Sequence, residues 1–381
     1  MSEQQTVGLS LLRVVLVNVW MDPQRGGGTA ERTRRLALSL AQLDCQCTVV
    51  TMGSTPWRRE LEQAGVDVLS VIYLGDRYPL PLVNVARLFS LFRTADIIHI
   101  MGVWFLLAAI SSVLGFLAGA PVVLCPAGSL TRFGRDAWLK RFYLATAGRW
   151  MLRTAGSIIA TTRQEQELLV SDFGVPPSLI FVSPNGIEAP QCPSQSVQMP
   201  DGRIILFLGR LVAIKAPDLL VEAFALVAPI LHDAILVFSG PDQGQQLKLQ
   251  KRVCELMLEG RVIFTGFIDE KHRTALLART SVLVVPSHSE VMSMVALEAG
   301  AMGVPVIVSD KCGFPEVGEV GGGLVVDADS PALARALVQI LSDDANLAEM
   351  GKRLQKFVLE RFSWPAVAAS LVEHFGTLER V

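Results

Sequence analysis

The sequence contains few cysteines, few histidines and few charged residues. Its six cysteines form no CxxC pair, so neither a disulfide framework nor a zinc ribbon is predicted, and reduced thiols are the simplest interpretation. Its five histidines show no HExxH or HxxxH spacing, which argues against a zinc hydrolase. Charged residues make up 18% of the chain, hydrophobic residues 51%, and the net charge is −2. This composition excludes overall disorder and does not fit a generally basic nucleic-acid binder.

Several nucleotide and hydrolase motifs are also missing. A GxGxxG fingerprint after Gly26 and Gly28 would need glycine at position 31, where Glu31 stands. Neither a GxxxxGK[ST] phosphate loop nor a GxSxG nucleophile elbow occurs. The segment Asp327-Ala328-Asp329 is similar to the DxD metal site of some sugar transferases, but a helix that begins with Ser330 as N-cap and Pro331 explains it better. We therefore predict no metal site.

No segment is predicted to target the chain to, or anchor it in, a membrane. The run Val103–Leu124 is almost wholly apolar and about long enough to span a bilayer. Gly115, Gly119 and Pro121 interrupt it, which favours a buried helix followed by a strand over 121–125. We therefore expect a cytoplasmic protein.

Apolar runs that alternate with helical patterns occur in two series. The first series covers residues 12–19, 48–51, 66–72, 97–101, 122–125 and 157–160, with a glycine-rich turn at 26–28 and a helix over 29–43. Residues 188–202 are rich in Pro, Ser and Gln, lack periodicity and read as a linker. The second series covers residues 204–208, 235–239, 262–265, 282–285 and 304–308. Strands this apolar predict parallel sheets that are covered on both faces.

The predicted architecture is therefore α/β, with two doubly wound, Rossmann-like domains. We place the first domain at 1–187, the linker at 188–202, the second domain at 203–360, and a C-terminal segment at 361–381 that returns to the first domain. Ligands of doubly wound sheets bind at the carboxyl ends of the strands, so the expected site is a cleft between the domains.

Two cations follow the first strand of the second series. Arg210 comes directly after Gly209, where the strand ends, and Lys215 follows five residues later. A guanidinium and a nearby ammonium suit a diphosphate, although solvated surface cations would give the same pattern.

Two glutamates frame the start of a later helix. After the strand that ends before Pro286, we expect a helix from about Val291, with Glu290 at its entrance and Glu298 two turns inside. The backbone amides of Val291–Met294 would then be free to bind an anion. Glu298 lies on an otherwise apolar helix and needs a polar partner, which is either a ribose diol or an arginine.

These segments together resemble a known family. Gly209-Arg210-Leu211 with Lys215, Glu290 with Glu298, and the turn around Gly313-Phe314-Pro315 are similar to the motifs of the retaining nucleotide-sugar glycosyltransferases of family 4. The first half is similar too, at Gly27-Gly28, Asp96–His99 and Pro184-Asn185-Gly186-Ile187. The resemblance covers nearly the whole chain and implies the GT-B fold, in which two Rossmann-like domains face each other across a cleft.

The resemblance also implies residue roles. Arg210 and Lys215 would hold the donor diphosphate in place of a metal, Glu290 would contact the donor sugar, and Glu298 would bind the ribose. The remaining donor-binding residues that it implies are Gly27, Gly28, Phe267, Val291, Met292, Ser293 and Met294. Catalysis would need no cofactor beyond the nucleotide-diphosphate sugar, which is a co-substrate, and Glu290, Arg210 and Lys215 would be the catalytic residues. We expect the acceptor to be a glycan or a lipid-linked acceptor in cell-surface polysaccharide or lipopolysaccharide assembly.

The chain departs from the family pattern at two places. Ala127 stands where the family usually has a histidine, and Val291-Met292-Ser293 stands where it favours Gly-Phe-Gly. These departures keep open an alternative from another class, a non-catalytic scaffold that binds a sugar nucleotide. A dinucleotide oxidoreductase is disfavoured by the failed fingerprint.

A basic, aromatic segment covers residues 131–153. Its cations alternate with aromatic residues and its only acid is Asp136. This pattern fits peripheral contact with an anionic membrane at the inner face of the plasma membrane, and equally a solvated helix whose aromatic side chains face the core.

Overall fold

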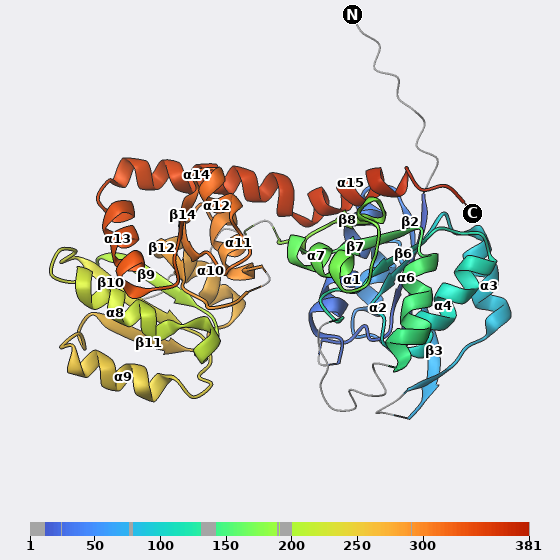
Figure 1. The fold of residues 1–381 in the computed structure, drawn as a ribbon, viewed down its shortest axis with the longest axis horizontal. Helices are drawn as coiled ribbons and strands as arrows, with labels where there is room; N and C mark the ends of the chain where they lie inside the picture. The colour runs from blue at the N-terminus through green and yellow to red at the C-terminus, as the bar shows by residue number, and fades with distance from the viewer. Residues whose placement is uncertain are drawn as a thin grey trace, which may run out of the picture. The chain divides into compact units, whose positions relative to one another are not determined.

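The chain folds into two units, each with its own sheet. The computed structural model describes residues 12–23, 25–75, 79–130, 142–188, 190, 200–290 and 292–380. Residues 1–186 and 364–381 form the first unit, and residues 187–363 form the second (Figure 1). Most of the predicted linker, residues 189 and 191–199, lies outside the described residues.

The sheet of the first unit has the strand order β4-β3-β2-β1-β5-β6-β7-β8. Its strands are β1 (Arg13–Asn18), β2 (Gln46–Met52), β3 (Asp67–Leu74), β4 (Leu80–Leu82), β5 (Ile97–Met101), β6 (Val122–Cys125), β7 (Ser157–Ala160) and β8 (Ile180–Val182). Among these strands only β3 and β4 pair antiparallel. The chain passes from β1 to β2 on one side and from β5 to β6 on the other, so the strand order reverses between β1 and β5.

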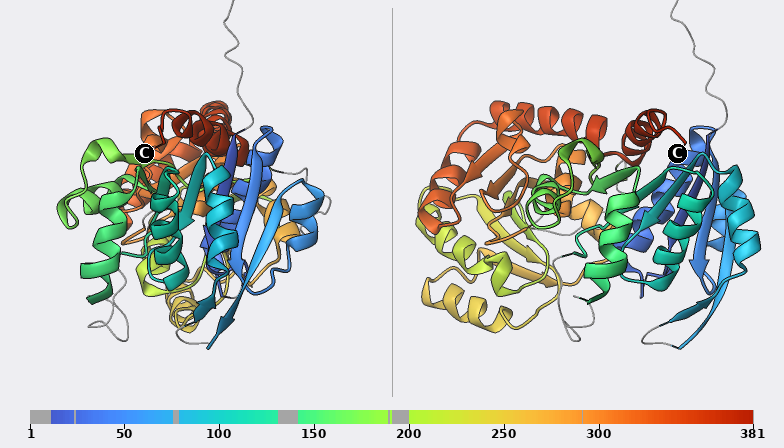
Figure 2. Two further views of the ribbon diagram at one scale, coloured as in Figure 1. Left: turned by 90° about the vertical axis from the view of Figure 1, so that its right-hand side faces the viewer. Right: turned by 45° about the vertical axis from the view of Figure 1, so that its right-hand side comes forward.

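Helices cover both faces of this sheet. The helices are α1 (Gly27–Gln42), α2 (Arg58–Gln63), α3 (Val85–Thr94), α4 (Leu106–Leu117), α6 (Arg149–Thr154), α7 (Arg163–Ser171) and α15 (Trp364–Phe375). One apolar core joins the sheet to α3, α4, α6 and α7, and the other joins it to α1, α2 and α15. The views in Figure 2 show α3, α4 and α6 side by side on their face of the sheet.

The returning helix α15 completes the second of these cores. Trp364, Val367, Leu371 and Phe375 are buried against α1 and the sheet. A Cβ added to Gly186 would lie 2.4 Å from Cδ2 of Trp364, so only glycine fits where the chain passes this ring. We expected the returning segment to begin at 361, but this position falls inside α14 (Asp344–Phe362) and the return begins at Trp364.

The second unit repeats the doubly wound plan. Its strands are β9 (Arg203–Leu208), β10 (Ala234–Ser239), β11 (Val262–Gly266), β12 (Thr280–Val285), β13 (Val306–Ser309) and β14 (Gly323–Val326), in the order β11-β10-β9-β12-β13-β14. Helices α8 (Pro217–Val227), α9 (Gln246–Glu255) and α13 (Ser330–Leu341) share one core with this sheet. Helices α10 (Glu270–Arg279), α11 (Met294–Ala301), α12 (Glu316–Glu319) and α14 share the other. All described strand pairs of this sheet are parallel.

The long apolar run forms α4 and β6, so the predicted division into a helix and a strand is confirmed. The expected burial of the helix is wrong, because Val113, Phe116 and Leu117 of α4 are each at least 41% exposed. Within the described residues, every helix is too short or too polar to cross a lipid bilayer.

Candidate active site

Three charged residues of the second unit that the sequence singled out lie where its strand order reverses. Strands β9 and β12 are neighbours, but the chain continues from β9 to β10 on one side and from β12 to β13 on the other. The loops that leave two such strands diverge and leave room for a ligand at the carboxyl edge of the sheet. The first loop carries Arg210 and Lys215, and the second carries Glu290.

Lys215 and Glu290 form an ion pair between these two loops. The Lys215 ammonium contacts Oε1 of Glu290, and the Ser287 hydroxyl donates a hydrogen bond of 2.7 Å to the same oxygen. The Glu290 side chain is only 8% exposed, while that of Lys215 is 25% exposed. The backbone N–H of His288 donates to the carbonyl of Ile214 at 2.9 Å, which joins the loops a second time. The pair is therefore held in place by its surroundings.

Arg210 lies at the same edge but outside this pair. Its guanidinium is exposed, and Nη1 donates to Oε1 of Gln243 at 3.2 Å. The loops after β9 and β10 approach closely here, since a Cβ on Gly240 (φ +140°) would lie 2.0 Å from the carbonyl oxygen of Gly209. Only glycine fits at position 240, and its absence of a side chain lets the two loops lie together.

The helix after Glu290 begins later than predicted. We expected it to start near Val291, but α11 starts at Met294, because the Ser293 hydroxyl accepts a hydrogen bond from the N–H of Ala296 and caps the helix. Ser293 is fully buried, so its side chain serves the helix, while Met292 and Met294 are half-buried. Val291 lies outside the described residues.

Glu298 lies a little more than one turn inside α11, not two turns inside. Its Oε2 is 3.3 Å from Nη1 of Arg273 on α10, an ion-pair distance without hydrogen-bond geometry. Burial raises the pKa of the Glu298 carboxyl above its ordinary value, although the Arg273 charge opposes this shift. The polar partner that the sequence demanded is thus an arginine, and this arginine is itself partly exposed.

Phe267 lies beyond the end of β11, where it is 77% exposed. The neighbouring Thr265 hydroxyl donates to the Ser239 hydroxyl at 3.0 Å. The segment after β11 therefore offers an exposed aromatic ring at the carboxyl edge of the same sheet.

The glycine turn of the first unit lines a pocket of about 410 Å³. The lining residues are Arg25, Gly26, Gly27, Gly28, Thr29, Arg32, Ala127, Thr161 and Asn185, which follow β1, β6, β7 and β8 at the carboxyl edge. Gly27 has a φ of +51°, and a Cβ added to Gly27 or Gly28 would meet no atom within 4 Å. No side chain among the described residues caps the start of α1. The predicted glycine turn thus borders open space at a helix N-terminus.

Arg32 is the buried cation of this pocket, and the sequence did not single it out. It is 2% exposed, and its Nη1 donates to the carbonyl of Pro184 at 2.7 Å and to Oδ1 of Asn185 at 2.9 Å. Its Nη2 donates to the carbonyl of Ser183 at 3.0 Å. Its hydrogen-bonded acceptors are neutral, so its positive charge is not cancelled by direct contact with a carboxylate in the described structure.

Glu165 on α7 joins the two loops that bring Ala127 and Thr161 to the pocket. It accepts hydrogen bonds from the N–H of Gly128 at 2.6 Å and from the N–H of Thr161 at 2.7 Å. Ala127 itself has a left-handed φ of +51°, which a residue with a Cβ adopts only at a cost. His99, behind the pocket on β5, is neutral, because burial and then the Arg32 charge lower its pKa to about 3.

The described residues contain no group of three histidine, cysteine or acidic side chains that could hold a metal. The Asp327–Asp329 segment serves as a helix cap, since Oδ1 of Asp329 accepts from the N–H of Ala332 at 2.7 Å. The cap is therefore Asp329 rather than Ser330, which is the first residue of α13.

Known proteins share this architecture over its whole length. The crystal structure of Anabaena Alr3699/HepE in complex with UDP has a TM-score of 0.72 and 20% sequence identity, and the match covers 96% of this chain and 100% of that one. A glycosyltransferase from Rickettsia africae has a TM-score of 0.71 and 17% identity, over 96% of this chain and 98% of its own. These similarities define two parallel-sheet α/β domains of the GT-B kind.

Sequence comparison assigns the chain to a family, whereas the structural similarities above show only its fold. The family model of the glycosyl transferase 4-like domain matches residues 27–186, and the model of glycosyl transferases group 1 matches residues 193–357. The chain belongs to this glycosyltransferase family. The D-inositol 3-phosphate glycosyltransferase of Streptomyces bingchenggensis is 29% identical over 59% of this chain, and the match covers 54% of that protein. The chain thus spans about half the length of the curated relatives it matches.

Proposed function

We propose that this chain transfers one sugar, with retention at the anomeric carbon, from a nucleotide-diphosphate sugar to an acceptor. The observation that carries the proposal is the Lys215–Glu290 pair at the reversal of the strand order in the second unit. An ammonium at this edge suits the phosphate oxygens of a donor, and a carboxylate beside it suits a sugar that develops positive charge. Family membership and the exposed Arg210 at the same edge support it.

The departing nucleoside diphosphate must be stabilised by positive charge, and in this chain basic side chains would supply that charge. Lys215 and Arg210 would stabilise the leaving group, with Glu298 toward the ribose and Phe267 toward the base. Both described contacts of the Glu290 carboxylate fall on Oε1, so Oε2 is the oxygen that would face the donor sugar. We propose that this chemistry requires neither a metal nor a further cofactor.

For the acceptor, two classes are proposed. The named relatives act on D-inositol 3-phosphate, which favours a phosphorylated polyol. A glycan or a lipid-linked acceptor of cell-surface polysaccharide or lipopolysaccharide assembly is the other class. The pocket of the first unit, with Arg25 and Arg32 in its lining, suits an anionic group in either case.

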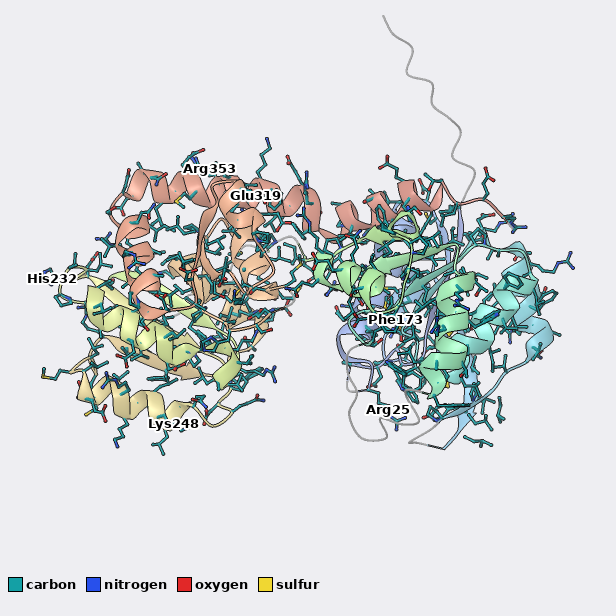
Figure 3. The ribbon with its side chains drawn as sticks, viewed as in Figure 1. Arg25, Phe173, His232, Lys248, Glu319 and Arg353 are labelled. Atoms are coloured by element: carbon teal, nitrogen blue, oxygen red, sulfur yellow. The ribbon has the colours of Figure 1, made fainter. Side chains whose placement is uncertain are left out.

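The proposal is tested first by donor binding. Thermal stabilisation of the full chain by UDP-, GDP- and ADP-sugars identifies the donor, because a ligand that binds the folded state raises its melting temperature. Lys215→Ala is expected to weaken that donor roughly tenfold to a hundredfold. Lys248→Ala is the matched control, since Lys248 is exposed on α9 (Figure 3). Equal donor affinity in both variants would refute the placement of the diphosphate.

The scaffold alternative predicts a different result. Ala127 lines the pocket at the position where the family usually has a histidine. A scaffold would bind the donor, lose it in Lys215→Ala, and yet neither transfer nor slowly hydrolyse the sugar. Release of the nucleotide from the best-binding donor, with and without EDTA, therefore separates the two functions and tests the independence from metals.

We further propose that the basic segment 131–153 contacts an anionic membrane, at the inner face of the plasma membrane. Residues 131–141 lie outside the described structure. In the remainder, Phe142, Arg149 and Arg153 are exposed, whereas Met151 and Leu152 are buried in the core. This distribution supports a surface that presents cations and one aromatic ring to its surroundings.

A further inference from the structure

Helix α4 exposes apolar side chains and buries its polar ones, which is the reverse of an ordinary surface helix. The side chains that it turns outward are all apolar, and they recur every three or four residues: Leu106, Ala109, Ile110, Val113, Phe116 and Leu117. Its two polar residues, Ser111 and Ser112, are buried. A helix on the surface of a protein normally turns its polar side to water, so this outward stripe indicates a surface that meets something other than water.

Arginines flank this stripe on both sides. Helices α3 and α6 both contact α4, and the Phe116 ring packs edge-on against Trp150 of α6, with ring centroids 6.1 Å apart. Arg87 and Arg93 are exposed on α3, and Arg149 and Arg153 are exposed on α6. None of the three helices contains an acidic residue. The apolar stripe therefore has a cationic border.

The β3–β4 hairpin adds apolar surface beside α4. The register pairs Ile72 with Leu82 and Leu74 with Leu80, which places all four side chains on one face of the hairpin. Each is at least 50% exposed, while Pro81 on the opposite face is buried. Strand β4 contacts α4, so the hairpin face and the helix stripe belong to the same part of the first unit.

The charges of the chain are segregated toward this region. The described residues 79–130 and 142–156 contain four arginines against one acid, Asp96, whereas the whole chain has 34 basic and 36 acidic residues. An anionic lipid bilayer offers both partners that such a surface needs: acyl chains for the apolar stripe and phosphates for the arginines. A protein partner would have to supply an apolar groove and an acidic border together.

We propose that the outward face of α4, bordered by α3, α6 and the β3–β4 hairpin, docks on an anionic lipid bilayer. The inference builds on the membrane contact proposed above and moves its centre from the basic segment to α4. Its test measures lipid binding without sugar transfer, so the docking surface and the transferase function can fail independently of each other.

The experiment is co-sedimentation of the full chain with two kinds of vesicle, phosphatidylcholine alone and phosphatidylcholine with roughly one-third phosphatidylglycerol. The wild type is expected to bind the anionic vesicles and to lose affinity as salt rises. Val113→Ser with Leu117→Ser should reduce this binding about tenfold, because both side chains are exposed and would leave the acyl boundary. Arg149→Glu with Arg153→Glu should reduce it roughly thirtyfold or more, and weaken its salt dependence.

Matched controls lie on helices of the second unit. Leu226→Ser with Leu247→Ser removes two apolar side chains that are 57% and 80% exposed, and should leave vesicle binding unchanged. Arg335→Glu with Lys352→Glu, both exposed on α13 and α14, controls for net charge. Melting temperatures of all variants verify folding. Wild-type binding by the α4 variant, or no preference of the wild type for anionic vesicles, overturns the proposal. A change of oligomeric state in the α4 variant, without vesicle binding by the wild type, would overturn it in favour of a protein interface.

Discussion

The two units present their cations at equivalent edges in opposite ways. In the second unit, Lys215 is paired with the carboxylate of Glu290. In the first unit, Arg32 is bound by the carbonyls of Ser183 and Pro184 and by the Asn185 amide, which are all neutral. Both edges lie at the carboxyl ends of parallel strands, where the strand order reverses or beside it.

The two cations therefore differ in what their surroundings allow: one is fixed in position by a carboxylate, and the other has no carboxylate in direct contact. A paired ammonium is positioned by its partner and keeps its geometry while a ligand comes and goes. The Arg32 guanidinium touches only neutral acceptors, and its one described carboxylate influence, from Glu165, acts without a direct contact. In a region of low dielectric such a charge attracts anions more strongly than at the surface. In the proposed reaction, the edge of the second unit would therefore fix the geometry of the reacting groups, and the edge of the first unit would hold its loops in order and attract an anion.

The largest expected effect is on the reaction. Glu290→Gln keeps the shape of the side chain and its bond from Ser287 but removes the charge that would stabilise the developing cation. We expect kcat to fall roughly 100- to 1,000-fold with a smaller change in KM. Glu319→Gln, on an exposed residue of α12, is the matched control (Figure 3). An unchanged kcat in a folded Glu290→Gln protein would show that the edge of the second unit does not take part in the reaction as proposed.

The next effect is on stability and concerns the first edge. Arg32→Met keeps an apolar stem but leaves the carbonyls of Ser183 and Pro184 without their donor, which should cost about 3 kcal/mol. The melting temperature of the first unit should fall by several degrees. Arg59→Met, on an exposed residue of α2, should change little. If both variants melt alike, Arg32 does not hold the edge together.

A pH-dependent effect is expected at Glu298. Because its pKa is raised in the folded protein, the folded state binds the proton more tightly than the unfolded state does, and stability falls as pH rises through the unfolded and then the folded pKa. Glu298→Gln removes this loss, so the variant should gain in melting temperature relative to the wild type over the pH range that begins near the ordinary carboxyl pKa of 4.5 and extends upward. A constant difference across this range would mean that Arg273 fully compensates the buried charge.

In the donor reaction, the same Glu298→Gln variant should behave unlike Glu290→Gln. The ribose does not react, so loss of a contact to it removes binding that is shared by the ground and transition states. KM for the donor should therefore rise while kcat changes less. Both constants are measured for both variants. If Glu298→Gln lowers kcat and Glu290→Gln raises KM instead, the proposed orientation of the donor in the site is wrong.

The smallest effect sharpens the comparison of backbones. Among the described residues, each unit has one alanine with a left-handed φ, Ala127 at +51° and Ala216 at +47°. Replacing either by glycine relieves the strain at some cost in chain entropy, and should stabilise its unit by about 0.5–1 kcal/mol. A gain at Ala216 without a gain at Ala127 would indicate that the pocket enforces the strained conformation for another reason.

The central strands of both sheets could be predicted from the sequence because they are buried on two faces. Residues 97–101, 122–125 and 157–160 are predicted and observed with the same bounds. The strands that sequence analysis missed, β4, β8 and β14, are all edge strands. They are only three or four residues long, and β4 contains Pro81, so their apolar sequences are too short to be assigned to strands from the sequence.

At the site, the sequence predicted which loops carry the functional residues, but not which side chains contact each other. The loops that carry Lys215 and Glu290 were predicted from the strands that precede them, but not that the two side chains pair, because the contact depends on which strands are neighbours. Ser293 was available as a capping residue and would have corrected the helix start. Arg32 and Arg273 were missed because each is one of several arginines on its helix or nearby, and only packing decides which of them reaches the pocket or Glu298.

The return of the chain through α15 has a consequence for synthesis. The core around α1 is closed by Trp364, Val367, Leu371 and Phe375, which leave the ribosome after all of residues 187–363. The second unit is therefore complete before the first, although the first begins earlier. Until α15 emerges, the nascent first unit exposes the apolar side chains that this helix covers. A chaperone that binds exposed apolar surface would therefore act mainly during this period.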